Sequence, residues 1–215
     1  MKKLGFLLLH LLIAFLSPYA WLSMVLRSSG GLLTATGLAS LKYFTVLSNL
    51  LSGLASLILV LSRLLKKDAP WIHRLHYAAA VSVGLTFLTV IAFLGPLYGY
   101  EAMFEGSNLW LHLVLPLAAE AAFILFNPMP MTRRDNALAV LPMLLYGVGY
   151  VGNILANGRD ANDWYSFLAW GYCSGKPTAA GNAQRSSRHT AASWGGSLAV
   201  RASAFLPVHN SVAAA

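Results

Sequence analysis

The sequence predicts an all-α integral membrane protein, a polytopic bundle of about five transmembrane helices. Of its 215 residues, 57% are hydrophobic and only 10% are charged, too few charges for a water-solvated globular surface. The apolar residues gather in runs of about 20, the length that a helix needs to cross a hydrocarbon core. The basic residues lie at the ends of these runs rather than on one face interleaved with aromatic residues, so they indicate topology and not nucleic-acid binding.

The first predicted span runs from Leu4 to Leu26 and follows two lysines. A cleaved signal peptide is the alternative, but the apolar run continues to Leu26 without a clear small-residue cleavage site, which favours an uncleaved helix. Polar, Gly-rich or Pro-containing connections separate the remaining spans. These are Leu41 to Leu65, Arg74 to Leu97, Ser107 to Phe126 and Asn136 to Ala156.

The distribution of Lys and Arg predicts the orientation, because cytoplasmic loops retain positive charge. With the N-terminus in the cytoplasm, eight bases flank the spans on the cytoplasmic side and three on the other. The cytoplasmic set is Lys2, Lys3, Arg63, Lys66, Lys67, Arg74, Arg133 and Arg134, and the opposite set is Arg27, Lys42 and Arg159. We therefore expect a multi-pass protein of the cell membrane with a cytoplasmic N-terminus.

The composition changes near the C-terminus. The predicted membrane domain covers residues 1–172 and ends in an aromatic segment, Asp163 to Trp170, that suits the headgroup zone. Residues 173–215 are rich in Ala, Ser, Gly and Arg and contain no apolar run long enough to cross the bilayer. We expect this tail to be disordered.

Soluble-enzyme motifs are absent from the sequence, so candidate chemistry lies among polar residues within the spans. The single cysteine excludes an intramolecular disulfide and a Cys-based zinc site. His73 and His76 stand three residues apart without a suitably spaced acidic or cysteine partner. We therefore expect no metal and no cofactor. His10, in the first span, is interpreted as a lone structural histidine.

Two polar stripes are expected to turn inward, since facing lipid would be costly. The second span carries Thr45, Asn49 and Ser52 on one face, and the fourth carries Asn108, His112, Pro116 and Glu120. Thr45 and His112 lie at similar expected depths, on the order of 6 and 7.5 Å from the starts of their spans.

An imidazole within reach can activate a hydroxyl as a nucleophile, so Thr45 and His112 form a candidate catalytic pair. The alternative is structural, because threonine in a membrane helix often bonds the i−4 carbonyl and an inward histidine often bridges helices. Asn49 and Asn108 lie one turn from the pair and are weaker candidates for oxyanion donors. Glu120 is deeper, and either a proton relay or a structural hydrogen bond fits it.

Short motifs around these residues resemble the bacterial "Pr-six-Pr" integral membrane proteins. The motifs are Lys42-Tyr43-Phe44-Thr45 with Ser48-Asn49-Leu50-Leu51, then Asn108 with His112-Leu113-Val114-Leu115-Pro116, and the end around Asp163-Trp164-Tyr165. The resemblance covers roughly residues 4 to 172. That group is in turn distantly similar to the androgen-induced multi-pass membrane proteins, which are threonine hydrolases of fatty acid esters of hydroxy fatty acids.

The resemblance implies that the family's threonine is Thr45 and its histidine is His112. It implies a lipid-ester substrate that enters from the bilayer. The family usually has one more membrane helix after the aromatic segment, whereas this chain continues into the Ala/Ser/Arg-rich tail, so a sixth helix is expected to be missing. The alternative function is non-enzymatic: a small-solute or lipid carrier, or a helix-assembly factor. The oligomeric state is left open.

Overall fold

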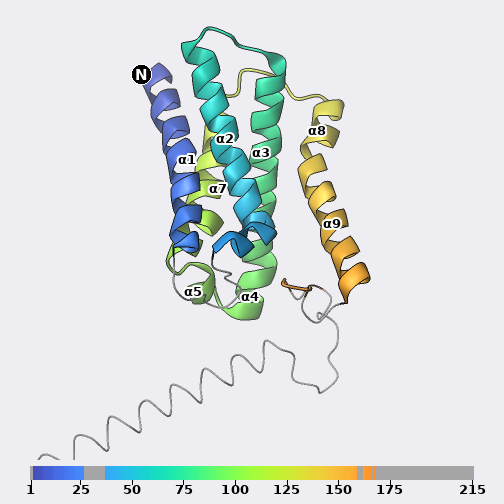
Figure 1. The fold of residues 1–215 in the computed structure, drawn as a ribbon. Coiled ribbons are helices and arrows are strands. Elements are labelled where there is room, and N and C mark those ends of the chain that lie inside the picture. The colour runs from blue at the N-terminus through green and yellow to red at the C-terminus, as the bar shows by residue number, and fades with distance from the viewer. Residues whose placement is uncertain (1, 27–36, 159–161, 166, 168–215) are drawn as a thin grey trace, which may run out of the picture. The chain divides into compact units, whose positions relative to one another are not determined.

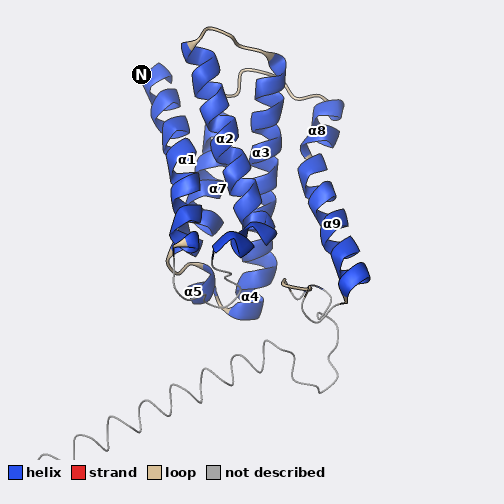
Figure 2. Ribbon diagram, in the orientation of Figure 1, coloured by secondary structure: helices blue, strands red, loops and turns tan. Residues whose placement is uncertain are grey.

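Helices dominate the computed structural model, and no β-strand occurs among its described residues (Figure 2). The structure describes residues 2–26, 37–158, 162–165 and 167. Within these ranges the predicted all-α fold is confirmed. The predicted disordered tail at 173–215 and the expected loss of a sixth helix lie outside the described residues.

Five helical stretches in the described part of the chain are long and apolar enough to cross a membrane, as predicted. They are Lys3–Val25, Phe44–Leu64, Pro70–Tyr98, Ser107–Phe126 and Arg133–Asn157, and each boundary lies within four residues of its prediction. The constituent elements are α1 (Lys2–Val25), η1 (Gly37–Lys42), α2 (Phe44–Leu64), α3 (Pro70–Thr89), η2 (Val90–Leu94), α4 (Gly95–Tyr98), α5 (Tyr100–Met103), α6 (Ser107–Leu109), η3 (Trp110–Val114), α7 (Leu115–Phe126), α8 (Arg133–Ala139) and α9 (Leu141–Asn157).

The first four spans form a bundle in which α1 packs on α2, α2 on α3, α3 on α7, and α7 back on α1 (Figure 1). The fifth span, α8 with α9, packs against α3. At the start of α8, Thr132 and Asp135 form a reciprocal capping box, and Asp135 also accepts a 2.8 Å bond from Arg74 of α3. This contact ties the fourth connection to the bundle.

The described helices combine a mixed interior with an apolar surface. Their interior holds hydroxyl, amide and imidazole groups beside apolar side chains such as Ile13, Val46 and Leu111, and many large apolar side chains point outward. Strongly exposed apolar residues occur along several spans, among them Leu8, Leu12, Phe15, Leu54, Leu88, Ile124, Leu145, Val148 and Leu155. A surface of this kind suits lipid and suggests a membrane protein.

Two π-helical turns interrupt the third and fourth spans, at η2 and η3, and a proline follows each of them. Pro96 follows Val90–Leu94, and Pro116 follows Trp110–Val114. Proline lacks an N–H, and its ring clashes with the carbonyl four residues earlier. A wider turn relieves that clash, so the prolines explain where the turns occur. Single π turns are frequent at functional sites, and η3 contains His112.

Candidate active site between the second and fourth spans

Thr45 is the second residue of α2 and is buried, with 8% of its surface exposed. The depth predicted for it assumed an α-helix from Leu41, but the chain up to Lys42 is the 3₁₀ helix η1. Thr45 therefore lies closer to the end of its span than predicted. Its hydroxyl makes no hydrogen bond with the described part of the chain, so the bond to the i−4 carbonyl, on which the structural alternative depends, is not formed.

His112 lies in the π turn η3 and is also 8% exposed. Its Nδ1 is 2.8 Å from the Met103 carbonyl oxygen. A carbonyl only accepts, so Nδ1 carries the proton and the neutral ring presents an unprotonated Nε2. No described residue hydrogen-bonds to that Nε2. This tautomer is the one that a general base acting through Nε2 requires.

Asn49 connects the two helices that carry these residues. Its Nδ2 donates to the Thr45 carbonyl oxygen at 2.7 Å and to the Leu111 carbonyl oxygen at 2.9 Å. Leu111 directly precedes His112, so one amide group fixes the first turn of α2 against the π turn. The structure thus brings the two helices together, but no hydrogen bond joins the Thr45 and His112 side chains among the described residues.

The two weaker oxyanion candidates differ in how many donors they retain. Both amide hydrogens of Asn49 are used by backbone carbonyls, so this arrangement makes it a positioning residue and not a free donor. Its Oδ1 is buried without a partner in the described chain. Asn108 uses one hydrogen for a 3.3 Å bond to the Ala102 carbonyl oxygen and retains the other. Asn108 is accordingly the one of the two that keeps an amide hydrogen available as a donor.

The segment that contacts His112 was not found from the sequence. This segment is α5, whose last residue, Met103, is 1% exposed and offers its carbonyl oxygen to His112 Nδ1. Gly99 and Gly106 lie on either side of α5 with φ of 90° and 58°, a region that favours glycine. These two turns return the chain to the start of the fourth span. The glycines were the available sequence feature, but a backbone carbonyl contact leaves no side-chain pattern.

Both polar stripes turn inward to different extents. Thr45, Asn49 and Ser52 are buried, as are His112 and Pro116, whereas Asn108 and Glu120 are half-buried. A carboxylate oxygen of Glu120 lies so close to Gly84 of α3 that a Cβ there would overlap it. No hydrogen bond or ion pair joins Glu120 to another described residue. The described chain therefore offers Glu120 no partner for either a proton relay or a structural hydrogen bond.

The interpretation of His10 as a lone histidine is wrong. Its ring centroid lies 5.1 Å from that of His76, and the Nε2 atoms of both rings are buried without hydrogen-bond partners in the described chain. The expectation that His73 lacks an acidic partner is also wrong, because its Nε2 lies 2.8 Å from the Asp68 carboxylate. No cluster of three or more metal-ligating side chains occurs among residues 2–26, 37–158, 162–165 and 167.

Comparison with known proteins adds no relative: no family model, curated protein or solved structure matches the chain. The resemblance noted around Thr45 and His112 consequently depends on those short motifs alone. The described residues define an all-helical protein with five helices apolar enough to cross a membrane and an interior in which polar and apolar side chains are mixed.

Proposed function

We propose that the chain is a multi-pass protein of the cell membrane, with a cytoplasmic N-terminus, that belongs to the Pr-six-Pr group and hydrolyses lipid esters. Thr45 is the proposed nucleophile and His112 the proposed base. The observation that carries the proposal is the state of His112: Nδ1 is held by the Met103 carbonyl, and Nε2 is left unprotonated and without a partner in the described chain. The unpartnered hydroxyl of Thr45 on the adjoining helix supports the same assignment.

The proposed reaction has two steps, acylation and deacylation of Thr45. His112 Nε2 takes the hydroxyl proton while Thr45 Oγ1 attacks the acyl carbonyl carbon, and the imidazolium then gives that proton to the leaving alkoxide. The alcohol departs and an acyl-threonine remains. In the second step His112 takes a proton from water, the hydroxide attacks the acyl carbon, and the proton returns to Thr45 as the fatty acid leaves.

The oxyanion that forms in each step needs a donor. Asn108 retains a free amide hydrogen and is the proposed source, whereas Asn49 holds the two helices in register. The acyl chains of the substrate would enter laterally from lipid, because the helices expose apolar faces. The proposed partners are the bilayer and a lipid ester.

Fluorophosphonate labelling tests the pair. The wild-type protein in detergent should be labelled, Thr45→Ala should remove the label, and His112→Ala should slow labelling by about 10²–10⁴-fold, the usual contribution of general-base catalysis. Thr86→Ala is the matched control, since Thr86 is a buried threonine whose hydroxyl already bonds Ser48. Thr86→Ala should label like the wild type.

Absence of labelling in a monodisperse, helical wild type would contradict the hydrolase. Equal labelling of wild type and Thr45→Ala would also contradict it, because the reactive hydroxyl would then belong to another residue. Thr45→Ser should retain labelling, since it keeps the hydroxyl and removes only a methyl group.

One observation favours the non-enzymatic alternative. Asn49 donates its two amide hydrogens to the backbone carbonyls of Thr45 in the second span and Leu111 in the fourth. Such bonds hold helices together. If the polar stripes serve only to hold helices together, Thr45→Ser and Thr45→Ala should behave alike in stability and no substrate should be turned over. A carrier would predict in addition that solute or lipid uptake into vesicles depends on the purified protein.

A further inference from the structure

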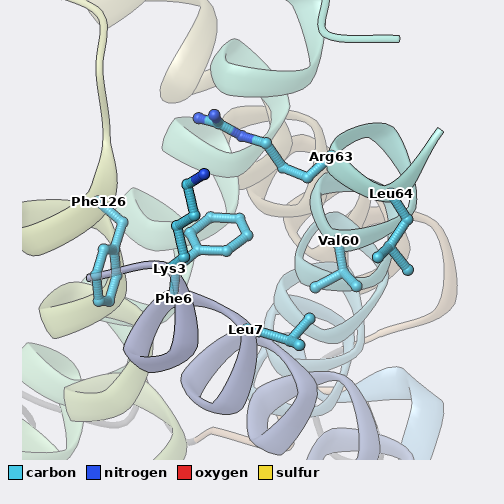
Figure 3. A pocket seen from close by; sticks show the side chains of 7 residues that line it. All are labelled: Lys3, Phe6, Leu7, Val60, Arg63, Leu64 and Phe126. Atoms are coloured by element: carbon cyan, nitrogen blue, oxygen red, sulfur yellow. The ribbon is translucent and has the colours of Figure 1, made fainter. Parts of the chain in front are cut away.

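A pocket of about 490 Å³ opens between α1, α2 and α7, at the end of the bundle that holds the N-terminus (Figure 3). Its volume lies in the range of ligand sites in proteins. It is lined by Lys3, Phe6, Leu7, Val60, Arg63, Leu64 and Phe126. Five of these residues are apolar and two are basic, and none is acidic.

The charged groups gather at one side of this pocket. Figure 3 shows the Lys3 ammonium and the Arg63 guanidinium on the same side, with the Phe6 ring beside them. The Arg63 guanidinium carbon lies 5.4 Å from the centroid of that ring. Two cations beside an apolar cavity favour a ligand that is anionic at one end and apolar at the other.

The chain itself supplies little compensating charge. Lys3 forms no ion pair with any described residue. Arg63 lies 4.0 Å from Asp68, but both side chains are 45% exposed, and exposed pairs at that distance contribute little. Asp68 also bonds His73 at 2.8 Å. An anion between the two cations would therefore meet positive charge that the described chain compensates only weakly, through Asp68.

We propose that this pocket binds one anionic phospholipid from the leaflet at this end of the bundle. The phosphate would lie between Lys3 and Arg63, and an acyl chain would pack on Phe6, Leu7, Val60 and Phe126. Basic pockets between spans on one side of a membrane protein recognise lipid head groups in this way. The inference rests on the proposed membrane location but not on the hydrolase, since about 27 Å of α2 separates Thr45 from Arg63 at 1.5 Å per residue.

The test is native mass spectrometry of the full chain in detergent, titrated with dioleoyl phosphatidylglycerol and, separately, with dioleoyl phosphatidylcholine. We expect one phosphatidylglycerol to bind more tightly than phosphatidylcholine. Lys3→Gln with Arg63→Gln should weaken it by about 30-fold, about fivefold for each cation near a membrane surface. The matched control is Lys66→Gln with Lys67→Gln, which removes equal charge from the same end of the bundle but outside the pocket, and it should change binding by less than about fivefold.

A second variant keeps the test decisive if the double substitution fails to fold. Leu7→Trp fills the apolar part of the pocket and leaves both cations in place, so it should weaken phosphatidylglycerol binding. Equal loss in both charge variants, or equal affinity for the two lipids, would overturn the proposal in favour of diffuse electrostatic attraction. Equally tight binding of glycerol 3-phosphate would assign a free phosphate site, and displacement by oleate at lower concentration than phosphatidylglycerol would assign a fatty acid; either result overturns the phospholipid.

Discussion

Replacing Gly53 by alanine tests a close approach between α1 and α2. A Cβ built on Gly53 would lie 2.8 Å from Ser17 Cβ and 3.0 Å from Ser17 Oγ. Ser17 is fully buried, and its hydroxyl donates to the Ile13 carbonyl oxygen at 2.8 Å, so its side chain is not free to move away. The two helices would have to separate. Gly53→Ala should therefore destabilise the bundle.

The magnitude follows from two opposing effects. Overpacking of a well-packed interior costs about 1–3 kcal/mol, while alanine is favoured over glycine in a helix by about 1 kcal/mol. Gly149→Ala in α9 isolates the second effect, because an added Cβ there meets no atom within 4 Å. The free energy of unfolding of Gly53→Ala should accordingly fall below that of Gly149→Ala by about 1–3 kcal/mol.

Unfolding in mixed micelles at increasing dodecyl sulfate fraction, followed by far-UV circular dichroism, measures this difference. The Ser17→Gly background provides a double-mutant cycle, since it removes the atoms that the new methyl would meet. In that background, Gly53→Ala should lose most of its penalty. Equal free energies for Gly53→Ala and Gly149→Ala, or a penalty that persists without the Ser17 side chain, would refute the close packing of α1 on α2.

Two further predictions concern the polar interior. Asn49→Leu removes the hydrogen bonds to the Thr45 and Leu111 carbonyls and should lower the free energy of unfolding by about 1 kcal/mol, because such bonds in membranes average about 0.6 kcal/mol each. The same variant should slow fluorophosphonate labelling of Thr45. Unchanged labelling would mean that Asn49 serves only to pack the helices. Glu120→Gln should change the free energy of unfolding by less than about 0.5 kcal/mol, since Glu120 has no ion pair in the described chain. Loss of fluorophosphonate labelling in this variant would instead support a proton relay.

The inward direction of the second span's polar face was predictable from the sequence. A helix period of 3.6 places Thr45, Asn49 and Ser52 on one side, and the cost of exposing amides to lipid decides which side faces in. The structure confirms that all three are buried. The same periodicity does not fix which atoms meet across the interface. For this reason the sequence led to Asn49 as an oxyanion donor, whereas both of its hydrogens are taken by backbone carbonyls.

The histidines show the same difference between what the sequence predicts and what only helix packing fixes. Their residue types and faces were visible in the sequence, but His10 and His76 are 66 positions apart. Only the packing of α1 and α3 against the same two helices, α2 and α7, places their rings 5.1 Å apart. The partner of His112 is a backbone carbonyl at Met103, which no residue pattern encodes. Equally, Lys3 and Arg63 appeared in the sequence as topology signals, and the pocket that they border arises from the meeting of three helices.

The sequence by itself determined the number, length and approximate boundaries of the five apolar helices, because a helix that crosses lipid must be about 20 residues long and must satisfy its own backbone. Tertiary structure decided which polar groups meet: Asn49 meets the Leu111 carbonyl, His112 meets the Met103 carbonyl, and Lys3 and Arg63 line one pocket. The physical reason is that helical periodicity sets the face that each residue occupies, while the rotation, the axial shift and the π turns of the packed helices set the contacts between faces.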